Sequence, residues 1–174
     1  GLTENEASVV ANQLGYSKRM TQLLSYSEIK DLAHLLGNCP VFMEAMLSHS
    51  QDKYPNVCGY LRQEGLLDNI SYALVDSGWV GSMQKSFNHI LKSMGYQSEV
   101  EGYYFGMYEY PQNVDEKSYH VWYFRPETML RRKVYFNNNL FECIFSSPEA
   151  MTVGYEWGAD GYVPVFEKAV NPNW

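Results

Sequence analysis

The 174-residue chain has the composition of a folded protein, because 45% of its residues are hydrophobic and 19% are charged, which excludes intrinsic disorder. Its formal net charge of −7 argues against a nucleic-acid partner, since a general nucleic-acid surface needs a basic stripe and the only basic cluster is Arg131-Arg132-Lys133. No apolar run approaches the roughly 18 residues of a membrane span, so none is predicted.

The capping-box pattern, Ser or Thr followed three residues later by Glu, occurs at Thr3 and at Ser25. Each predicts the start of a helix, and the glycines that follow the apolar-periodic runs predict their ends near Gly15 and Gly37. Two shorter helices are expected next, one from Val41 to about Ser48 and one opened by Pro55.

The character of the chain changes after residue 68. Tyr72–Val75 is a short apolar run, Met83–Met94 has helical periodicity, and Val100–Met107 is a second apolar run. This order predicts a right-handed parallel βαβ unit, and Tyr119–Phe124 is predicted as a third strand.

The last part of the chain predicts a helix over Leu140–Phe145, capped by one of the preceding asparagines, and then a hairpin. Met151–Trp157 and Tyr162–Phe166 flank an Asp-Gly turn, and Pro164 places the second strand at an edge. The predicted fold class is therefore α/β. A mostly helical N-terminal third (1–68) is followed by a Rossmann-like, mainly parallel sheet with a C-terminal β-hairpin (69–174), all in a single domain (1–174).

The cysteines and the first residues bear on where the protein acts. An odd number of cysteines without a Cys-x-x-Cys pair (Cys39, Cys58, Cys143) argues against a disulfide framework and predicts reduced, mostly buried thiols. The polar, acidic start shows no signal peptide, so a cytoplasmic location is expected. Because the chain begins with Gly1, we expect it to be a fragment of a longer multidomain protein.

The segment from Leu74 to Gln84 is the most informative for function. Its order, a strand that ends in Asp76, a glycine-punctuated turn and a helix start, gathers N–H groups at a positive helix end, which suits an anion such as phosphate. Ligands of open α/β sheets collect just outside the carboxyl ends of the strands. A carboxylate at this place, here Asp76, can in general bind a metal, hold ribose or sugar hydroxyls or act as a catalytic base, or else it caps its own turn by accepting from Gly78 or Trp79.

The other residues of this segment have a structural alternative as well. Gly78 and Gly81 allow a ligand to approach closely, or simply let the strand turn into the helix. Ser82 is a candidate N-cap or phosphate ligand, and Trp79 either stacks on a ligand ring or acts as a hydrophobic plug. The predicted ligand-binding residues are Asp76, Ser77, Gly78, Trp79, Gly81, Ser82 and Gln84.

Several known signatures do not occur. The chain has no Gly-x-x-x-x-Gly-Lys-Ser/Thr loop, no Gly-x-Gly-x-x-Gly and no Gly-x-Ser-x-Gly. Its histidines lack metal-ligand spacing, so no metal site is predicted and no cofactor is identified. Sequence alone does not place the possible partners of Asp76, which are Glu101, Glu109 and Glu142.

Several blocks of the chain, spanning about Tyr60 to Phe166, resemble a region of bacterial surface-polysaccharide biosynthesis proteins. In that family the region lies downstream of a catalytic domain of the haloacid dehalogenase (HAD) superfamily, often fused to glycosyltransferase domains. The blocks that carry the resemblance are Tyr60–Leu66, Ala73–Gln84, Gly102–Gly106, Phe141–Glu142 with Phe145–Pro148, Val153–Tyr155 and Val163–Val165.

This chain departs from that family at Ser77, where an apolar residue is usual, and at Ser82, where Thr is usual. The HAD nucleophile motif Asp-x-Asp-x-Thr/Val does not occur, so phosphatase activity is not implied. The loop also resembles the diphosphate-ribose loop of phosphoribosyltransferases, but Ser77 replaces the second acid and the spacing is one residue short.

Together these features predict an accessory α/β domain of a bacterial polysaccharide-biosynthesis protein. Its ligand would be a sugar phosphate or nucleotide-linked sugar at the junction 76–84, and its partner a neighbouring HAD or glycosyltransferase domain. The alternatives are a non-catalytic scaffold that docks through its aromatic residues, and a transferase, phosphoribosyltransferase-like or glycosyl, with Asp76 or Glu142 as base.

Overall fold

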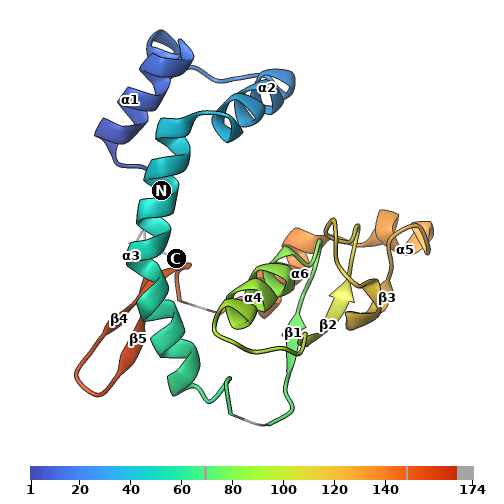
Figure 1. Ribbon diagram of the computed structural model, residues 1–174. Coiled ribbons are helices and arrows are strands. Elements are labelled where there is room, and N and C mark those ends of the chain that lie inside the picture. The colour runs from blue at the N-terminus through green and yellow to red at the C-terminus, as the bar shows by residue number, and fades with distance from the viewer. Residues whose placement is uncertain (69, 148, 168–174) are drawn as a thin grey trace. The chain divides into compact units, whose positions relative to one another are not determined.

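A computed structural model describes residues 1–68, 70–147 and 149–167 (Figure 1). The chain divides into two compact units, the first over Gly1–Val57 and the second beginning at Cys58. Whether the two units fold together as one domain, as the sequence predicted, is a question of folding, so the single domain stays a prediction.

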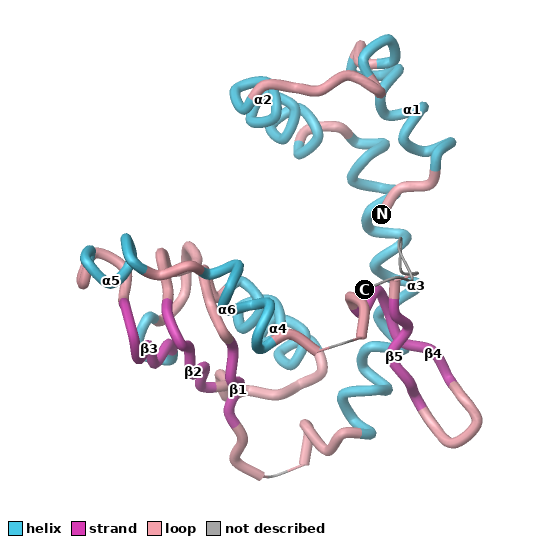
Figure 2. The backbone as a smooth tube through the Cα atoms, turned by 180° about the vertical axis from the view of Figure 1, so that it is seen from behind, coloured by secondary structure: helices cyan, strands magenta, loops and turns pink. Residues whose placement is uncertain are grey.

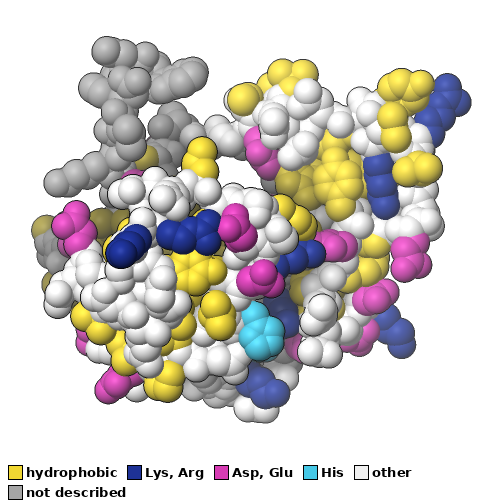
Figure 3. Space-filling model, turned by 90° about the horizontal axis from the view of Figure 1, so that it is seen from above, with side chains coloured by type: hydrophobic (Ala, Val, Ile, Leu, Met, Phe, Trp, Pro, Cys, Tyr) yellow, Lys and Arg dark blue, Asp and Glu magenta, His cyan; other side chains and the backbone are white. Residues whose placement is uncertain are grey.

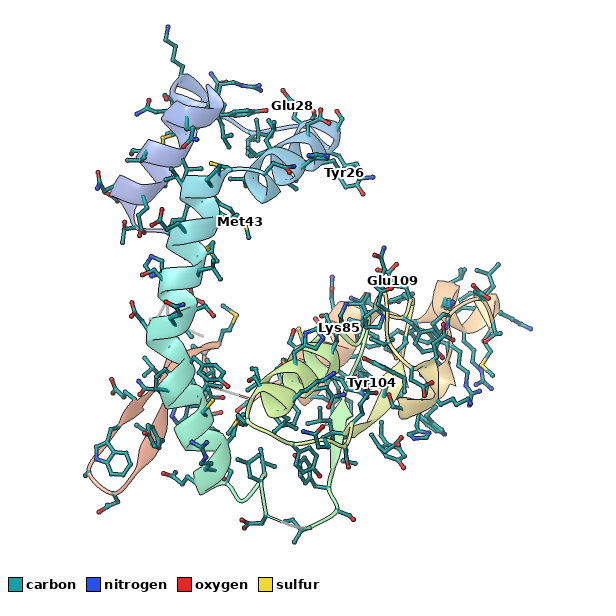
Figure 4. The ribbon with its side chains drawn as sticks, viewed as in Figure 1. Tyr26, Glu28, Met43, Lys85, Tyr104 and Glu109 are labelled. Atoms are coloured by element: carbon teal, nitrogen blue, oxygen red, sulfur yellow. The ribbon has the colours of Figure 1, made fainter. Side chains whose placement is uncertain are left out.

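The first unit is helical, as predicted. It contains α1 (Glu4–Leu14), the 3₁₀ turn η1 (Ser17–Arg19) and α2 (Tyr26–Gly37). Both predicted capping boxes are present, so Thr3 and Ser25 each accept a hydrogen bond from a glutamate N–H while that glutamate accepts from the cap residue's backbone. Figure 4 labels Tyr26 and Glu28 at the start of α2.

The prediction of two short helices after Pro40 was wrong. A single helix, α3 (Pro40–Gln63), covers that region with Pro55 inside it. Proline removes one N–H donor and crowds the carbonyl four residues earlier, so the helix continues here in spite of Pro55. The boundary between the two units falls within α3, after Val57.

The second unit contains a three-stranded sheet in the order β1-β2-β3, in which both neighbouring pairs are parallel (Figure 2). The strands are β1 (Ala73–Asp76), β2 (Glu101–Gly106) and β3 (Tyr119–Phe124). Helix α4 (Ser82–Ser93) connects β1 to β2, which confirms the predicted parallel βαβ arrangement. The connection from β2 to β3 contains the 3₁₀ turn η2 (Glu116–Ser118).

The two faces of this sheet differ. The face toward α4, here called the inner face, carries the buried residues Gly102, Tyr104, Gly106, Tyr119 and Val121. Tyr104, Met107, Tyr119 and Val121 form a core cluster, against which Tyr110 and Val114 of the β2–β3 connection pack. The opposite, outer face carries the alternate residues Val75, Tyr103, Phe105, His120 and Trp122.

The rest of the second unit consists of two short helices and a hairpin. Helix α5 (Leu130–Tyr135) was not predicted, whereas α6 (Asn138–Phe145) was, and Asn137 caps it by accepting from the Leu140 N–H. Strands β4 (Thr152–Trp157) and β5 (Tyr162–Phe166) form the predicted antiparallel hairpin. It is tied to the end of α3 by the Gln63 amide, which donates to the Tyr162 carbonyl and accepts from the Tyr162 N–H.

Candidate functional site

The segment between β1 and α4 is held by its own backbone. The Gly106 N–H donates to the Ser77 carbonyl at 3.3 Å, and the Tyr108 N–H donates to the Trp79 carbonyl at 2.8 Å. These bonds fasten the loop to the end of β2 and to the residues just after it. The loop is therefore fixed at the carboxyl end of the sheet, where the sequence predicted a site.

Gly78 and Gly81 are needed for close packing within the protein itself. Gly78 has a φ of +144°, and a Cβ there would overlap the Gly106 carbonyl oxygen. Gly81 has a φ of +64°, and a Cβ there would lie 2.6 Å from the Tyr119 ring and 2.9 Å from the Met107 methyl group. The structural alternative therefore explains both glycines without a ligand.

The prediction that Ser82 caps α4 was wrong. Gly81, in the left-handed conformation, is the N-cap, and Ser82 is the first helical residue. The cap makes no side-chain hydrogen bond, unlike Thr3, Ser25 and Asn137 at the starts of other helices. The first bond of the helix runs from the Lys85 N–H to the Gly81 carbonyl at 3.3 Å, so the N–H groups of Ser82 and Met83 precede it.

Asp76 lies on the inner face, because its register partner is Tyr104. Its Oδ1 accepts from the Gly78 N–H at 3.2 Å, so the predicted turn-capping role is present. Burial raises the pKa of the Tyr104 hydroxyl, and the neighbouring Asp76 carboxylate raises this pKa further. The half-buried carboxylate therefore sits next to a phenol that stays protonated at neutral pH.

A cavity of about 210 Å³ is lined by the end of β1 and by the first turn of α4. Asp76 lines it from the strand, Met83 and Gln84 from the helix, and Tyr104 from β2. Asp76 and Ser77 also line a second cavity, of about 370 Å³, that opens toward the outer face. Asp76 therefore lines two cavities, one beside α4 and one on the outer face.

Trp79 is a hydrophobic plug. Its ring packs against Tyr108, Phe124, Phe136 and Phe141, with ring centroids 5.1 to 6.1 Å apart. Its indole N–H donates to the Glu142 carboxylate of α6. This cluster positions α6 against the loop and engages Glu142, one of the two carboxylates that the transferase alternative offers as a base.

Gln84 is fully buried, with 0% exposure, and its amide joins α4 to the sheet. The amide nitrogen donates to the Val100 carbonyl at 2.8 Å and to the Ser118 carbonyl at 3.1 Å, and the amide oxygen accepts from the Tyr104 hydroxyl at 2.8 Å. Figure 4 labels Tyr104 on β2 and Lys85, the neighbour of Gln84, on α4. These contacts give Gln84 a structural role. The sequence did not indicate that Tyr104 is the neighbour of Asp76.

Two of the three possible partners of Asp76 are engaged elsewhere. Glu101 hydrogen-bonds with His120 on the outer face, and Glu142 accepts from the Trp79 indole N–H. Within residues 1–68, 70–147 and 149–167, no cluster of three or more His, Cys, Asp or Glu could hold a metal ion. All three cysteines are free thiols, of which Cys39 and Cys58 are buried.

Comparison with protein-family models, with curated proteins and with solved structures finds no match for this chain. In the part of the chain that the structure describes, no helix combines the length and the apolar character needed to cross a membrane.

Proposed function

We propose that this chain is a binding domain for a sugar phosphate or nucleotide-linked sugar in bacterial polysaccharide assembly. The ligand would occupy the junction between Asp76 and the first turn of α4. The observation that carries the proposal is the cavity that Asp76 lines together with Met83 and Gln84 of the first turn of α4, a helix whose N-cap makes no side-chain hydrogen bond. The N–H groups of Ser82 and Met83 would hold phosphate, and Asp76 would accept from sugar hydroxyls.

The sheet supports this proposal through its topology. Three sequential parallel strands in the order β1-β2-β3 are consistent with one half of a Rossmann-like sheet, so we infer that kinship. The resemblance to polysaccharide-biosynthesis proteins supplies the setting, in which a HAD or glycosyltransferase domain would be the neighbour. Trp79 and Gln84 would support the site from behind, since their polar groups are already bonded to the protein.

Ligand-induced thermal stabilisation tests the proposal. A nucleotide-linked sugar or sugar phosphate at about one hundred times its Kd should raise the melting temperature by about 5–10 °C. Asp76→Asn should remove this shift, and Asp160→Asn, in the hairpin turn, should keep it. Gly81→Val is unsuitable as a test because its side chain would collide with Tyr119. The proposal fails if no such ligand shifts the melting temperature, or if Asp76→Asn leaves the shift unchanged.

A docking role is the second candidate, favoured by the exposed apolar side chains of α5 and α6. Hydrophobic side chains reach the surface among charged ones on the face of the molecule in Figure 3. Those on the two helices are more than half exposed, and a patch of this kind often marks a protein interface. They are Leu130, Val134, Tyr135, Leu140, Ile144 and Phe145.

The docking role is tested by mixing the chain with a HAD or glycosyltransferase domain of a bacterial polysaccharide-biosynthesis protein. Co-elution that Ile144→Asp abolishes would support docking through α6. Co-elution unaffected by Ile144→Asp, or no co-elution at all, would count against it.

A further inference from the structure

The outer face of the sheet carries a groove that extends beyond the proposed phosphate site. Two cavities, of about 500 Å³ and about 370 Å³, share Tyr103, His120 and Trp122 in their linings. Since these three side chains come from the neighbouring strands β2 and β3, the cavities form one groove with a common floor, here called the outer groove. Each cavity has the volume of a small-molecule site.

The floor of the outer groove is aromatic and open to solvent. Trp122 is 73% exposed and Tyr103 is 49% exposed. Their rings are supported by neighbours: Tyr103 stacks on His120 with centroids 4.6 Å apart, and Trp122 meets the edge of Phe105 at 5.3 Å. Flat rings held in this way offer an apolar surface that a second ring can cover.

The walls of the outer groove are polar and carry charges of both signs. Glu116, Lys117 and Arg125 line one end, and Asp76 lines the other. These four side chains contribute two negative and two positive formal charges, and Glu101 at the floor adds a third negative charge. A polyanion gains little from such a surface, particularly on a chain of net charge −7.

We propose that the outer groove binds an uncharged saccharide chain. A sugar ring presents an apolar C–H face, which would cover Trp122 and Tyr103, and a rim of hydroxyl groups. These hydroxyls can both donate to carboxylates and accept from Lys117 and Arg125, so a neutral ligand uses walls of both signs. Two adjoining cavities, one lined by Arg125 and the other by Ser77, would accommodate successive rings of such a chain. The assignment does not rest on phosphate binding beside α4.

The test uses nuclear magnetic resonance to follow the indole N–H signals of the tryptophan side chains. The chain has four tryptophans, so its ¹H–¹⁵N spectrum holds four indole signals, and Trp122→Phe assigns one of them. Titration with malto-, cello- and chito-oligosaccharides should shift the Trp122 signal more than that of Trp157. Trp157 is the matched control, because it is 68% exposed on β4. Trp122→Ala should weaken binding about tenfold or more, and Trp157→Ala should not.

Two results would overturn the assignment. One is a Trp122 signal that none of these oligosaccharides moves. The other is a self-associating chain in which Trp122→Ala abolishes association, because the groove would then be a protein interface. Thermal stabilisation by a sugar phosphate should persist in Trp122→Ala, so the failure of either proposal can be recognised without the other.

Discussion

The two faces of the parallel sheet are built from alternate residues of the same strands, yet they differ in chemistry. Tyr104 on the inner face is buried and bonded to Gln84, while Tyr103 beside it is half exposed over a cavity. Parallel sheets are normally covered on both faces. On the outer face Phe105 packs against Phe136 and Phe141, whereas Tyr103 and Trp122 stay exposed. The contrast teaches that the buried contacts of this sheet lie mainly on the inner face and that the outer face is covered only in part.

The largest expected effect comes from breaking the inner face at Gln84. Gln84→Leu would leave the Tyr104 hydroxyl and the Val100 and Ser118 carbonyls buried without their partner, which should cost about 3–5 kcal/mol. Urea denaturation followed by fluorescence measures the loss. Gln97→Leu, at an exposed position, is the control and should stay within about 0.5 kcal/mol of the unmutated chain. Equal losses of stability in the two variants would show that the hydrogen bonds of the buried Gln84 amide do not stabilise the fold.

Gly102→Ala probes the same face through steric overlap. The added methyl group would overlap the Gln84 amide and approach the Tyr104 ring to 2.7 Å. Overpacking of this kind should cost about 1–3 kcal/mol. Gly154→Ala is the matched control, since a Cβ there has nothing within 4 Å and should change stability by about 0.5 kcal/mol at most. A stable Gly102→Ala protein would mean that α4 packs more loosely on the sheet.

Val121 and Trp122 are neighbours on β3 that point to opposite faces, so they test the comparison most directly. Val121→Ala, on the inner face, should cost about 2 kcal/mol. Trp122→Ala removes a far larger side chain but should cost at most about 1 kcal/mol, because Trp122 is 73% exposed. Chemical denaturation measures the free energy of unfolding of both variants. A larger loss in Trp122→Ala than in Val121→Ala would show that the outer face is part of the core.

The smallest effect is expected from an exposed polar network in the helical unit, which contrasts with the buried one around Gln84. The Thr3 N–H and the His49 ring hold the pKa of Glu6 at about 2, below its usual 4.5. A depressed carboxyl pKa stabilises the folded state above the ordinary value, and this contribution is lost as the pH falls from about 4.5 to about 2.

Circular dichroism should therefore show that the unmutated chain loses helix as the pH falls through this range, and that the loss is smaller in Glu6→Gln. Glu4→Gln, in the same helical turn, should lose helix with acid as the unmutated chain does. An identical acid transition in Glu6→Gln would rule out this contribution.

Features set by neighbouring residues could be predicted from the sequence. The capping boxes at Thr3 and Ser25, the cap at Asn137 and the parallel βαβ order all follow from patterns a few residues long or from one alternation of elements. Pro55 shows the limit of such patterns, because a residue that often opens a helix is also tolerated within one.

The position of the 76–84 loop at the end of β1 could be predicted from the sequence, but its contacts could not. Gly81 caps α4 because Tyr119 and Met107 leave no room for a side chain, and both lie far along the chain. The acceptors of the Gln84 amide lie 16 and 34 residues away, so no local pattern marks Gln84 as buried. The outer groove combines β2, β3 and their flanks, and its only sequence signal is the alternation that puts His120 and Trp122 on one face.

The exposed part of the outer face has a consequence for how the isolated protein behaves in solution. Val75 is 87% exposed beside Tyr103, and β1 and β3 are the edge strands of this sheet. At neutral pH, mutual repulsion between molecules of charge −7 opposes aggregation. Near the isoelectric point of about 5.0 this repulsion vanishes, so colloidal stability, rather than unfolding, should set the lower pH limit for concentrated samples.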